Sequence, residues 1–328
     1  MKKVLVTGAG GFIGHHLVNY LKDRGFWVRG VDIKLPEFED TRADEFEVLD
    51  LRRWDNCLQA TRGIEHVYAL AADMGGMGFI SANHSKILYN NALINFHTLE
   101  AAKTHGIERY LYTSSACIYP EYKQTEANVV PLKEEDAYPA APQDAYGWEK
   151  LMTEILCHHY TAEKLVDTRV VRFHNIFGPK GTWTGGREKA PAAMCRKIAN
   201  AKFSGNHEIE IWGDGEQTRT FCHIDDCTEG IYRLMMSDYN EPLNLGRDEL
   251  VSINELADTV ASVAGIEIIK KHISGPQGVR GRNSDNSKLR EVLGWEPQID
   301  LTTGIEMTYP WIEEQVRETL PAREAVAA

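Results

Sequence analysis

Tyr146 and Lys150 lie four residues apart in the segment YGWEK and are suited to acid–base chemistry on a hydroxyl group. Residues at i and i+4 of a helix share one face, so the lysine would lie one turn from the tyrosine. Its positive charge favours the ionised phenol, and we expect it to lower the pKa of Tyr146 enough for proton exchange near neutral pH. Ser115, at the end of a predicted strand, can hold the same hydroxyl group. The alternative is an amphipathic helix on which the pair is incidental.

A glycine-rich segment near the start of the chain, TGAGGFIG, follows an apolar run and precedes a helical pattern. Its glycines Gly8, Gly11 and Gly14 permit a tight turn, a close approach of a diphosphate to the main chain, and close packing of the helix against the strand. The helix N-terminus offers free N–H groups and a partial positive charge to phosphates. Phe12 and Ile13 belong to the same predicted cofactor site. The alternative is a plain glycine turn.

An acidic residue follows the glycine segment at the end of the second predicted strand. This residue, Asp32, can accept hydrogen bonds from a ribose diol and would repel a 2′-phosphate, which favours NAD over NADP. Lys34 lies close by and weakens that preference slightly. Asp50, after the third predicted strand, suits a contact with adenine, although a simple turn at the strand end explains it equally well.

The elements that must position these residues alternate between short apolar runs and helical patterns in the first half of the chain. This alternation predicts βαβ units and a doubly wound parallel Rossmann sheet with helices on both faces, an α/β fold. Such sheets bind ligands at the carboxyl ends of their strands, where the winding direction reverses. The predicted strands are 3–7, 27–31, 46–49, 66–69, 109–113 and 168–172, and the predicted helices are 14–24, 53–61, 85–105 and 145–163.

The pattern changes after Asn175, where residues 179–190 are rich in glycine, threonine and charge and are predicted to be a loop. A short strand at 208–212 and helices near 226–236, 253–264, 286–293 and 302–317 follow. We therefore expect an NAD-binding domain at 1–178, to which the chain returns near 220–250, and a smaller mixed α/β substrate-binding lobe at 179–328. The last residues, 323–328, are expected to be a frayed tail.

Bulk composition excludes several classes of partner. The 328 residues carry a net charge of −12, which repels nucleic acid and anionic membranes. No apolar run approaches the roughly 18 residues that a membrane span needs. Six cysteines form no CxxC pair and no zinc-like spacing with histidine, so we expect free thiols in the cytoplasm and no metal. If the ligand is anionic, arginine and lysine must gather locally at its site.

Four segments, TGAGGFIG, SSACIYP, YGWEK and RFHNIFGP, together resemble the extended short-chain dehydrogenase/reductases that act on nucleotide sugars. The resemblance covers essentially the whole chain and narrows to the GDP-mannose 3,5-epimerase family. The segments that carry this closer resemblance are AADMGGMGFI (71–80), SSACIYPE (114–121), PQDAYG (142–147), GTWTGGREKAPAA (181–193), WGDGEQTRTF (212–221) and GPQGVRGRNSDN (275–286).

The resemblance implies a cycle in which NAD takes a hydride from C4 of the hexose while Tyr146 takes the hydroxyl proton. The 4-ketone makes the hydrogens on C3 and C5 acidic, and reduction by NADH completes the cycle. Cys117 and Lys189 match the family's base and acid for inversion. Without the resemblance, Cys117 would be interpreted as a buried structural thiol and Lys189 as a solvated charge. Related 4,6-dehydratases carry Asp-Glu where this chain has Ala116-Cys117, and alanine cannot protonate a leaving hydroxyl group.

The same resemblance implies how GDP-mannose is held. Arg219 and Arg282 match positions that grip the diphosphate through the bidentate guanidinium fork, with Arg280 as an alternative to Arg282. Asn175 matches a substrate contact, and Gly75 is expected to line the sugar pocket through backbone groups. A homodimer through helices near 85–105 and 145–163 is also implied. The rival hypotheses are a UDP-hexose 4-epimerase, for which Cys117 and Lys189 are dispensable, and a non-catalytic module that senses NAD.

Overall fold

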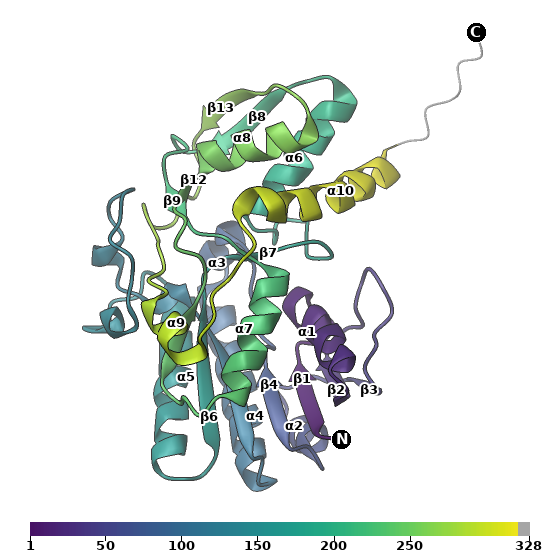
Figure 1. Cartoon of the computed structure of the whole chain (residues 1–328), viewed down its shortest axis with the longest axis vertical. Coiled ribbons are helices and arrows are strands. Elements are labelled where there is room, and N and C mark those ends of the chain that lie inside the picture. Colours follow the sequence, from purple (N-terminus) through teal and green to yellow (C-terminus); the bar gives the residue numbers. More distant parts are fainter. Residues whose placement is uncertain (321–328) are drawn as a thin grey trace, which may run out of the picture.

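Seven parallel strands form the main sheet of the computed structural model, which describes residues 1–320 (Figure 1). The strand order is β11-β6-β5-β4-β1-β2-β3, so the winding direction reverses between β1 and β4. This confirms the predicted doubly wound α/β fold and places the carboxyl ends of β1, β4 and β5 at the crevice where such sheets bind ligands. The strands are β1 (Lys3–Thr7), β2 (Trp27–Asp32), β3 (Glu45–Val48), β4 (His66–Ala69), β5 (Arg109–Ser115), β6 (Asp167–Phe173) and β11 (Pro242–Leu245).

Helices cover both faces of this sheet, and each face has its own apolar core. On one face lie α1 (Phe12–Asp23) and α7 (Ile224–Met236), and on the other lie α2 (Trp54–Thr61), α4 (His84–Thr104) and α5 (Ala145–Ala162). The last of these begins where the side chain of Asp144 accepts a hydrogen bond from the N–H of Gly147, at 2.9 Å. Because a capped helix end is fixed in direction, the start of α5 is held firmly beside the end of β5.

A further hydrophobic core lies beyond the carboxyl ends of the sheet, in the upper part of Figure 1. It is formed by α6 (Ala190–Ser204), α8 (Ile253–Ala264) and α10 (Leu301–Thr319), with the parallel pair β8 (Glu208–Trp212) and β13 (Ile269–Ile273). The sequence analysis missed α6, although its buried residues Met194, Ile198 and Ala201 follow the helical period. The glycine-rich segment just before it obscured the pattern. The strand β13 was missed as well, because its exposed lysines hide any alternation.

The remaining helices and strands are short. They are α3 (Met77–Ala82), α9 (Ser287–Leu293), the pair β7 (Ile176–Phe177) and β10 (Cys222–His223), the pair β9 (Thr218–Arg219) and β12 (Val251–Ser252), and 3-10 helices at Ala116–Ile118, Glu121–Lys123 and Glu134–Ala137. The strand β11 comes late in the chain yet extends the main sheet beside β6. The division into domains at residue 178 stays a prediction.

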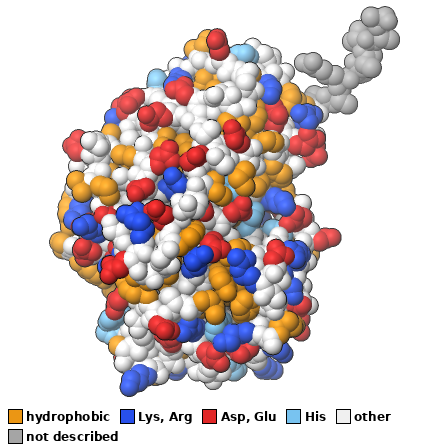
Figure 2. Space-filling model, in the orientation of Figure 1, with side chains coloured by type: hydrophobic (Ala, Val, Ile, Leu, Met, Phe, Trp, Pro, Cys, Tyr) orange, Lys and Arg blue, Asp and Glu red, His pale blue; other side chains and the backbone are white. Residues whose placement is uncertain are grey.

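Charged side chains of both signs are mixed on the face drawn in Figure 2, over the sheet region and over the upper core alike. Within residues 1–320, no helix is long and apolar enough to cross a membrane. The predicted tail at 323–328 lies outside the described residues.

Candidate active site

The glycine segment forms a turn between β1 and α1. The surrounding backbone leaves no room for a larger side chain at Gly8 or Gly14. Gly8 has a φ of +71°, and a Cβ atom there would lie 2.9 Å from the backbone nitrogen of Ala71. A Cβ atom on Gly14 would lie 2.0 Å from the carbonyl oxygen of Gly8. Helix α1 starts at Gly11 without a side-chain cap, so its first N–H groups are free for an anion. These features fit the diphosphate of NAD.

Asp32 lies at the end of β2, beside this turn. Its carboxylate accepts hydrogen bonds from the backbone N–H groups of Gly10, at 3.0 Å, and Ile33, at 2.6 Å. Burial raises the pKa of Asp32, while these N–H groups act in the opposite direction. Asp50 differs, because Arg52 pairs with its carboxylate through two nitrogens, at 2.7 and 2.9 Å. The proposed adenine contact of Asp50 would therefore involve a side chain that is already bound.

Strand β5 and helix α5 bring Ser115, Tyr146 and Lys150 together. The ammonium group of Lys150 donates to the carbonyl oxygen of Thr113, at 2.9 Å, and lies 5.6 Å from the centre of the Tyr146 ring. Both side chains are almost fully buried. A buried carboxylate, that of Glu149, compensates part of the positive charge of Lys150. The arrangement places a phenol, an ammonium group and a hydroxyl group at one point beyond the sheet.

The pKa of Tyr146 differs from the sequence-based expectation. Burial raises it well above the ordinary value, with Cys117 and Glu149 adding to the rise and Ser115 acting against it. Burial also lowers the pKa of Lys150. The expected lowering of the Tyr146 pKa is wrong for this structure, because removal of the phenol from water disfavours the phenolate.

Cys117 belongs to the 3-10 helix that follows β5 and packs against the cluster around Tyr146. Its N–H donates to the side chain of Ser115, at 3.2 Å, which fixes the turn. A Cβ atom on Gly147 would lie 2.2 Å from the carbonyl oxygen of Cys117, so only glycine allows α5 to approach this closely. Cys117 is partly exposed, whereas the other five cysteines are buried. The thiol therefore has access to a ligand.

Lys189 comes from a distant loop, yet its charge interacts with Cys117. It is the residue before α6, and burial lowers its pKa while the neighbouring Cys117 raises it. Loop residues before it are attached to the loop after β4. The guanidinium group of Arg187 pairs with Asp73, at 3.2 Å, and lies 3.8 Å from the ring centre of Phe79. The N–H of Gly76 donates to the carbonyl oxygen of Arg187, at 3.1 Å.

Two arginines near Cys117 have no acidic partner among the described residues. Arg219 donates to the carbonyl oxygens of Gln277 and Val279, at 3.0 and 2.8 Å. Arg282 donates to the side chains of Gln124, at 2.6 Å, and Cys117, at 3.2 Å. Burial and the nearby Arg282 together lower the pKa of Arg219 to about 9. Arg282 is buried and Arg219 is partly buried, and two such cations without a carboxylate form a site for an anion, since an anion relieves their repulsion.

Arg280, the alternative to Arg282, is engaged elsewhere. Its guanidinium group binds both carboxylate oxygens of Asp214, at 2.7 and 2.9 Å, in an exposed pair. The other predicted substrate contacts have local partners of their own. Asn175 has a φ of +47° and donates through its side chain to the carbonyl oxygen of Thr220, at 2.9 Å. Gly75 is buried against the side chain of Phe79.

Sequence reasoning missed several residues that shape this site. Gln124, Asp73 and Arg187 each hold a predicted site residue or its loop in place. Asp73 and Arg187 lie inside segments that carried the family resemblance, so their positions could have been singled out. Gln124 lies in the segment YKQTEA, which carried no signal.

Comparison with known proteins agrees with this geometry. The model of the NAD dependent epimerase/dehydratase family matches residues 4–246. GDP-mannose 3,5-epimerase 1 of Oryza sativa subsp. japonica is 55% identical over 96% of this chain and 83% of its own, and GDP-mannose 3,5-epimerase of Arabidopsis thaliana is 54% identical over the same shares. The crystal structure of a UDP-glucose 4-epimerase with UDP-glucose from Thermotoga maritima has a TM-score of 0.85 at 24% identity and covers 96% of this chain and 99% of its own, which shows the shared fold. The chain is therefore a member of the NAD dependent epimerase/dehydratase family, in the branch that contains the GDP-mannose 3,5-epimerases.

Proposed function

We propose that this protein converts GDP-D-mannose to GDP-L-galactose, with GDP-L-gulose as the product of inversion at C5 alone. The observation that carries the proposal is that Cys117 packs against Tyr146, within the predicted triad of Ser115, Tyr146 and Lys150, and that the charge of Lys189 interacts with Cys117. Hydride transfer at C4 needs only Ser115, Tyr146 and Lys150. The thiol of Cys117 and the ammonium group of Lys189 are two further groups that can transfer protons. Their presence supports a reaction that also exchanges protons on carbon.

The first step is oxidation at C4 of the hexose. Bound NAD⁺ supplies the hydride acceptor, and the residues proposed to hold it are Gly8, Gly11, Phe12, Ile13, Gly14, Asp32, Asp50, Tyr146 and Lys150. Tyr146 takes the hydroxyl proton, while Ser115 accepts or donates a hydrogen bond at the same oxygen. Lys150 stabilises the phenolate that forms, because its ammonium group lies near the ring. The buried position of Tyr146 excludes water from this proton transfer.

Inversion uses the second pair of groups. The 4-ketone stabilises a carbanion at C5 or C3 as an enolate, so a base of moderate strength suffices. The thiolate of Cys117 removes the proton, and the ammonium group of Lys189 returns one from the other face of the sugar. Burial lowers the pKa of Lys189, which makes it a better proton donor than an exposed lysine. Return of the hydride to C4 then completes the cycle.

The nucleotide is proposed to lie against residues 179–328, while residues 1–178 hold the cofactor. Arg219 and Arg282 would bind the diphosphate, since neither has an acidic partner among the described residues. Asn175 and Gly75 would contact the sugar. These cations also explain how a chain with a net charge of −12 can bind an anion.

A turnover experiment in D₂O tests the proposal against the rival 4-epimerase. The enzyme is incubated with GDP-mannose without added NAD, and the recovered sugar is examined by NMR. The native protein should place deuterium at C5 and C3, because both protons exchange with the solvent. A 4-epimerase places none at either carbon, since its ketone receives the same hydride back at C4. A protein that only senses NAD would leave the substrate unchanged.

Variants assign the proton transfer. Cys117→Ala should still reduce NAD but should incorporate far less deuterium at C5, and Lys189→Ala should slow reprotonation. The control is Cys195→Ala, which removes a buried thiol from the core around α6 and should leave the labelling pattern unchanged. Native exchange in the Cys117→Ala, Lys189→Ala double variant would show that another group is the base.

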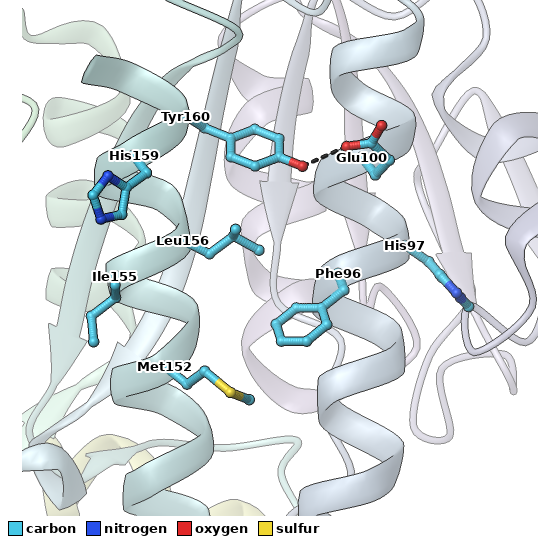
Figure 3. A pocket seen from close by; sticks show the side chains of 8 residues that line it. All are labelled: Phe96, His97, Glu100, Met152, Ile155, Leu156, His159 and Tyr160. Carbon is cyan, nitrogen blue, oxygen red and sulfur yellow. Dashed lines mark hydrogen bonds between the residues drawn. The ribbon is translucent and has the colours of Figure 1, made fainter. Parts of the chain in front are cut away.

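We also propose that two copies pair through α4 and α5. These helices expose five large apolar side chains: Leu88, Tyr89, Trp148, Met152 and Ile155. A groove between the helices is lined by Met152 and by two further apolar side chains, Phe96 and Leu156 (Figure 3). Burying such surface against a second copy is favourable. Sedimentation should report a dimer, and Ile155→Glu should shift it toward the monomer.

A cytoplasmic location is proposed because all six cysteines are free.

A further inference from the structure

The environment of Cys117 has a feature that the proposed reaction does not by itself require. Arg282 donates a hydrogen bond from Nη1 to the sulfur of Cys117, at 3.2 Å. The guanidinium group is buried, with 8% of the residue exposed, and no carboxylate of the described residues pairs with it. A cation that donates to sulfur favours the thiolate over the thiol. The charge of Arg282 is therefore available to Cys117.

Gln124 determines where the guanidinium group points. Its side-chain oxygen accepts from Nε of Arg282, at 2.6 Å, and its side-chain nitrogen donates to the carbonyl oxygens of Tyr119 and Pro120, at 3.0 and 3.1 Å. The two carbonyl acceptors leave one orientation for the amide, because the flipped amide would place oxygen against both. Only 1% of Gln124 is exposed, so no water replaces these partners. The segment is fixed further by N–H groups of Arg280 and Gly281 that donate to the backbone oxygen of Gln124.

A neutral amide suits this position better than a carboxylate. A glutamate would neutralise Arg282 and would face two carbonyl oxygens without a proton to donate. A glutamine holds the guanidinium group through one hydrogen bond and leaves its positive charge uncompensated. That charge can then act on the sulfur of Cys117.

We propose that Gln124 is a positioning residue that holds Arg282 against the sulfur of Cys117 and so keeps this sulfur reactive. The inference rests on the proposed function for its role in catalysis: the thiolate takes the C5 proton and becomes a thiol, while the electron pair of the C–H bond moves toward the ketone oxygen. The charged and titratable groups that face Cys117 are Arg282, Arg219, Lys189, Lys150 and Tyr146. Of these, Arg282 is the cation with a recorded hydrogen bond to the sulfur.

The test uses alkylation of the substrate-free protein by iodoacetamide, followed by intact mass. Cys117 is the one cysteine of six that is not buried, so the native fold should accept a single label. In Gln124→Met and in Gln124→Glu, labelling of Cys117 should slow about tenfold, the effect expected from loss of one charge-assisted hydrogen bond. The pH at which labelling reaches half its maximal rate should rise in both variants.

A matched control is Gln217→Met. Gln217 is also a buried glutamine whose side-chain nitrogen donates to a backbone carbonyl oxygen, that of Trp212, but its side chain makes no hydrogen bond to Arg282. This variant should label at the native rate. If Gln124 merely supports the fold, its variants should instead expose more cysteines and accept more than one label, faster than the native protein.

Labelling of Gln124→Met and Gln124→Glu at or above the native rate overturns the proposal. Where Gln124→Met does not fold, the near-isosteric Gln124→Glu and Arg282→Gln decide it, because both remove the available charge and both should slow labelling. The readout needs no substrate. Absence of turnover with GDP-mannose would therefore refute the proposed function without affecting the result for Gln124, and slow labelling with normal deuterium exchange would refute only the catalytic role.

Discussion

Replacing Arg282 or Arg280 in turn decides which of the two guanidinium groups binds the diphosphate, a choice that the sequence left open. Arg282 is buried and has no acidic partner among the described residues, whereas Arg280 is partly exposed and binds both oxygens of Asp214. A group that is already paired with a carboxylate has little charge left for a phosphate. We therefore expect Arg282→Ala to weaken binding far more than Arg280→Ala.

The expected magnitude follows from the contacts. Removing one charge-assisted hydrogen bond costs about 1.5–3 kcal/mol, which corresponds to an increase of roughly 10- to 150-fold in the Kd for GDP. Burial and repulsion from Arg282 together lower the pKa of Arg219 to about 9. Loss of Arg282 relieves that repulsion, so the increase in Kd should lie near the lower end of this range. Arg280→Ala breaks an exposed ion pair and should change the Kd less than about threefold.

Isothermal titration of each variant with GDP provides the measurement, since GDP carries the diphosphate and lacks the sugar. Arg282→Lys keeps the charge without the bidentate fork and should give an intermediate Kd. Raising the salt concentration should weaken binding to the native protein more than to Arg282→Ala. A larger loss in Arg280→Ala than in Arg282→Ala would refute the reasoning, because it would mean that Asp214 releases its partner to the ligand.

Three further outcomes are expected. Tyr146→Phe should lower turnover at least about 100-fold without weakening GDP-mannose binding, as measured by titration, because it removes the proton-transfer group and keeps the ring. Arg187→Ala should raise the KM for GDP-mannose while the Tm changes little, since its ion pair with Asp73 is exposed but attaches the loop before Lys189. Burial lowers the pKa of His174 to about 3 from 6.5. The unfolded state therefore binds a proton first, so the Tm should fall as the pH drops from 6.5 toward 3, and His174→Gln should reduce that fall in thermal melts.

The parts of the protein that sequence alone predicted depend on local patterns. The glycine turn at Gly8–Gly14 was predicted from three glycines at close spacing between an apolar run and a helical pattern, and the structure shows that Gly8 and Gly14 have no room for a Cβ atom. Tyr146 and Lys150 share a helix face because the helical period places them there. The alternation of strands and helices was likewise sufficient to predict the doubly wound sheet, which the strand order confirms. The roles proposed for the site residues stay predictions.

Tertiary structure decided what lies next to Cys117. Arg282 is separated from it by 165 positions and from Gln124 by 158, so no sequence period relates them. The partnership of Arg280 with Asp214 also required the fold, because the two arginines look equivalent in the segment GVRGRN. The pKa of Tyr146 likewise depended on burial, which the position of Lys150 one helical turn away cannot reveal. Side-chain chemistry was readable from the sequence, whereas the charge balance around it depends on distances that only the packed chain establishes.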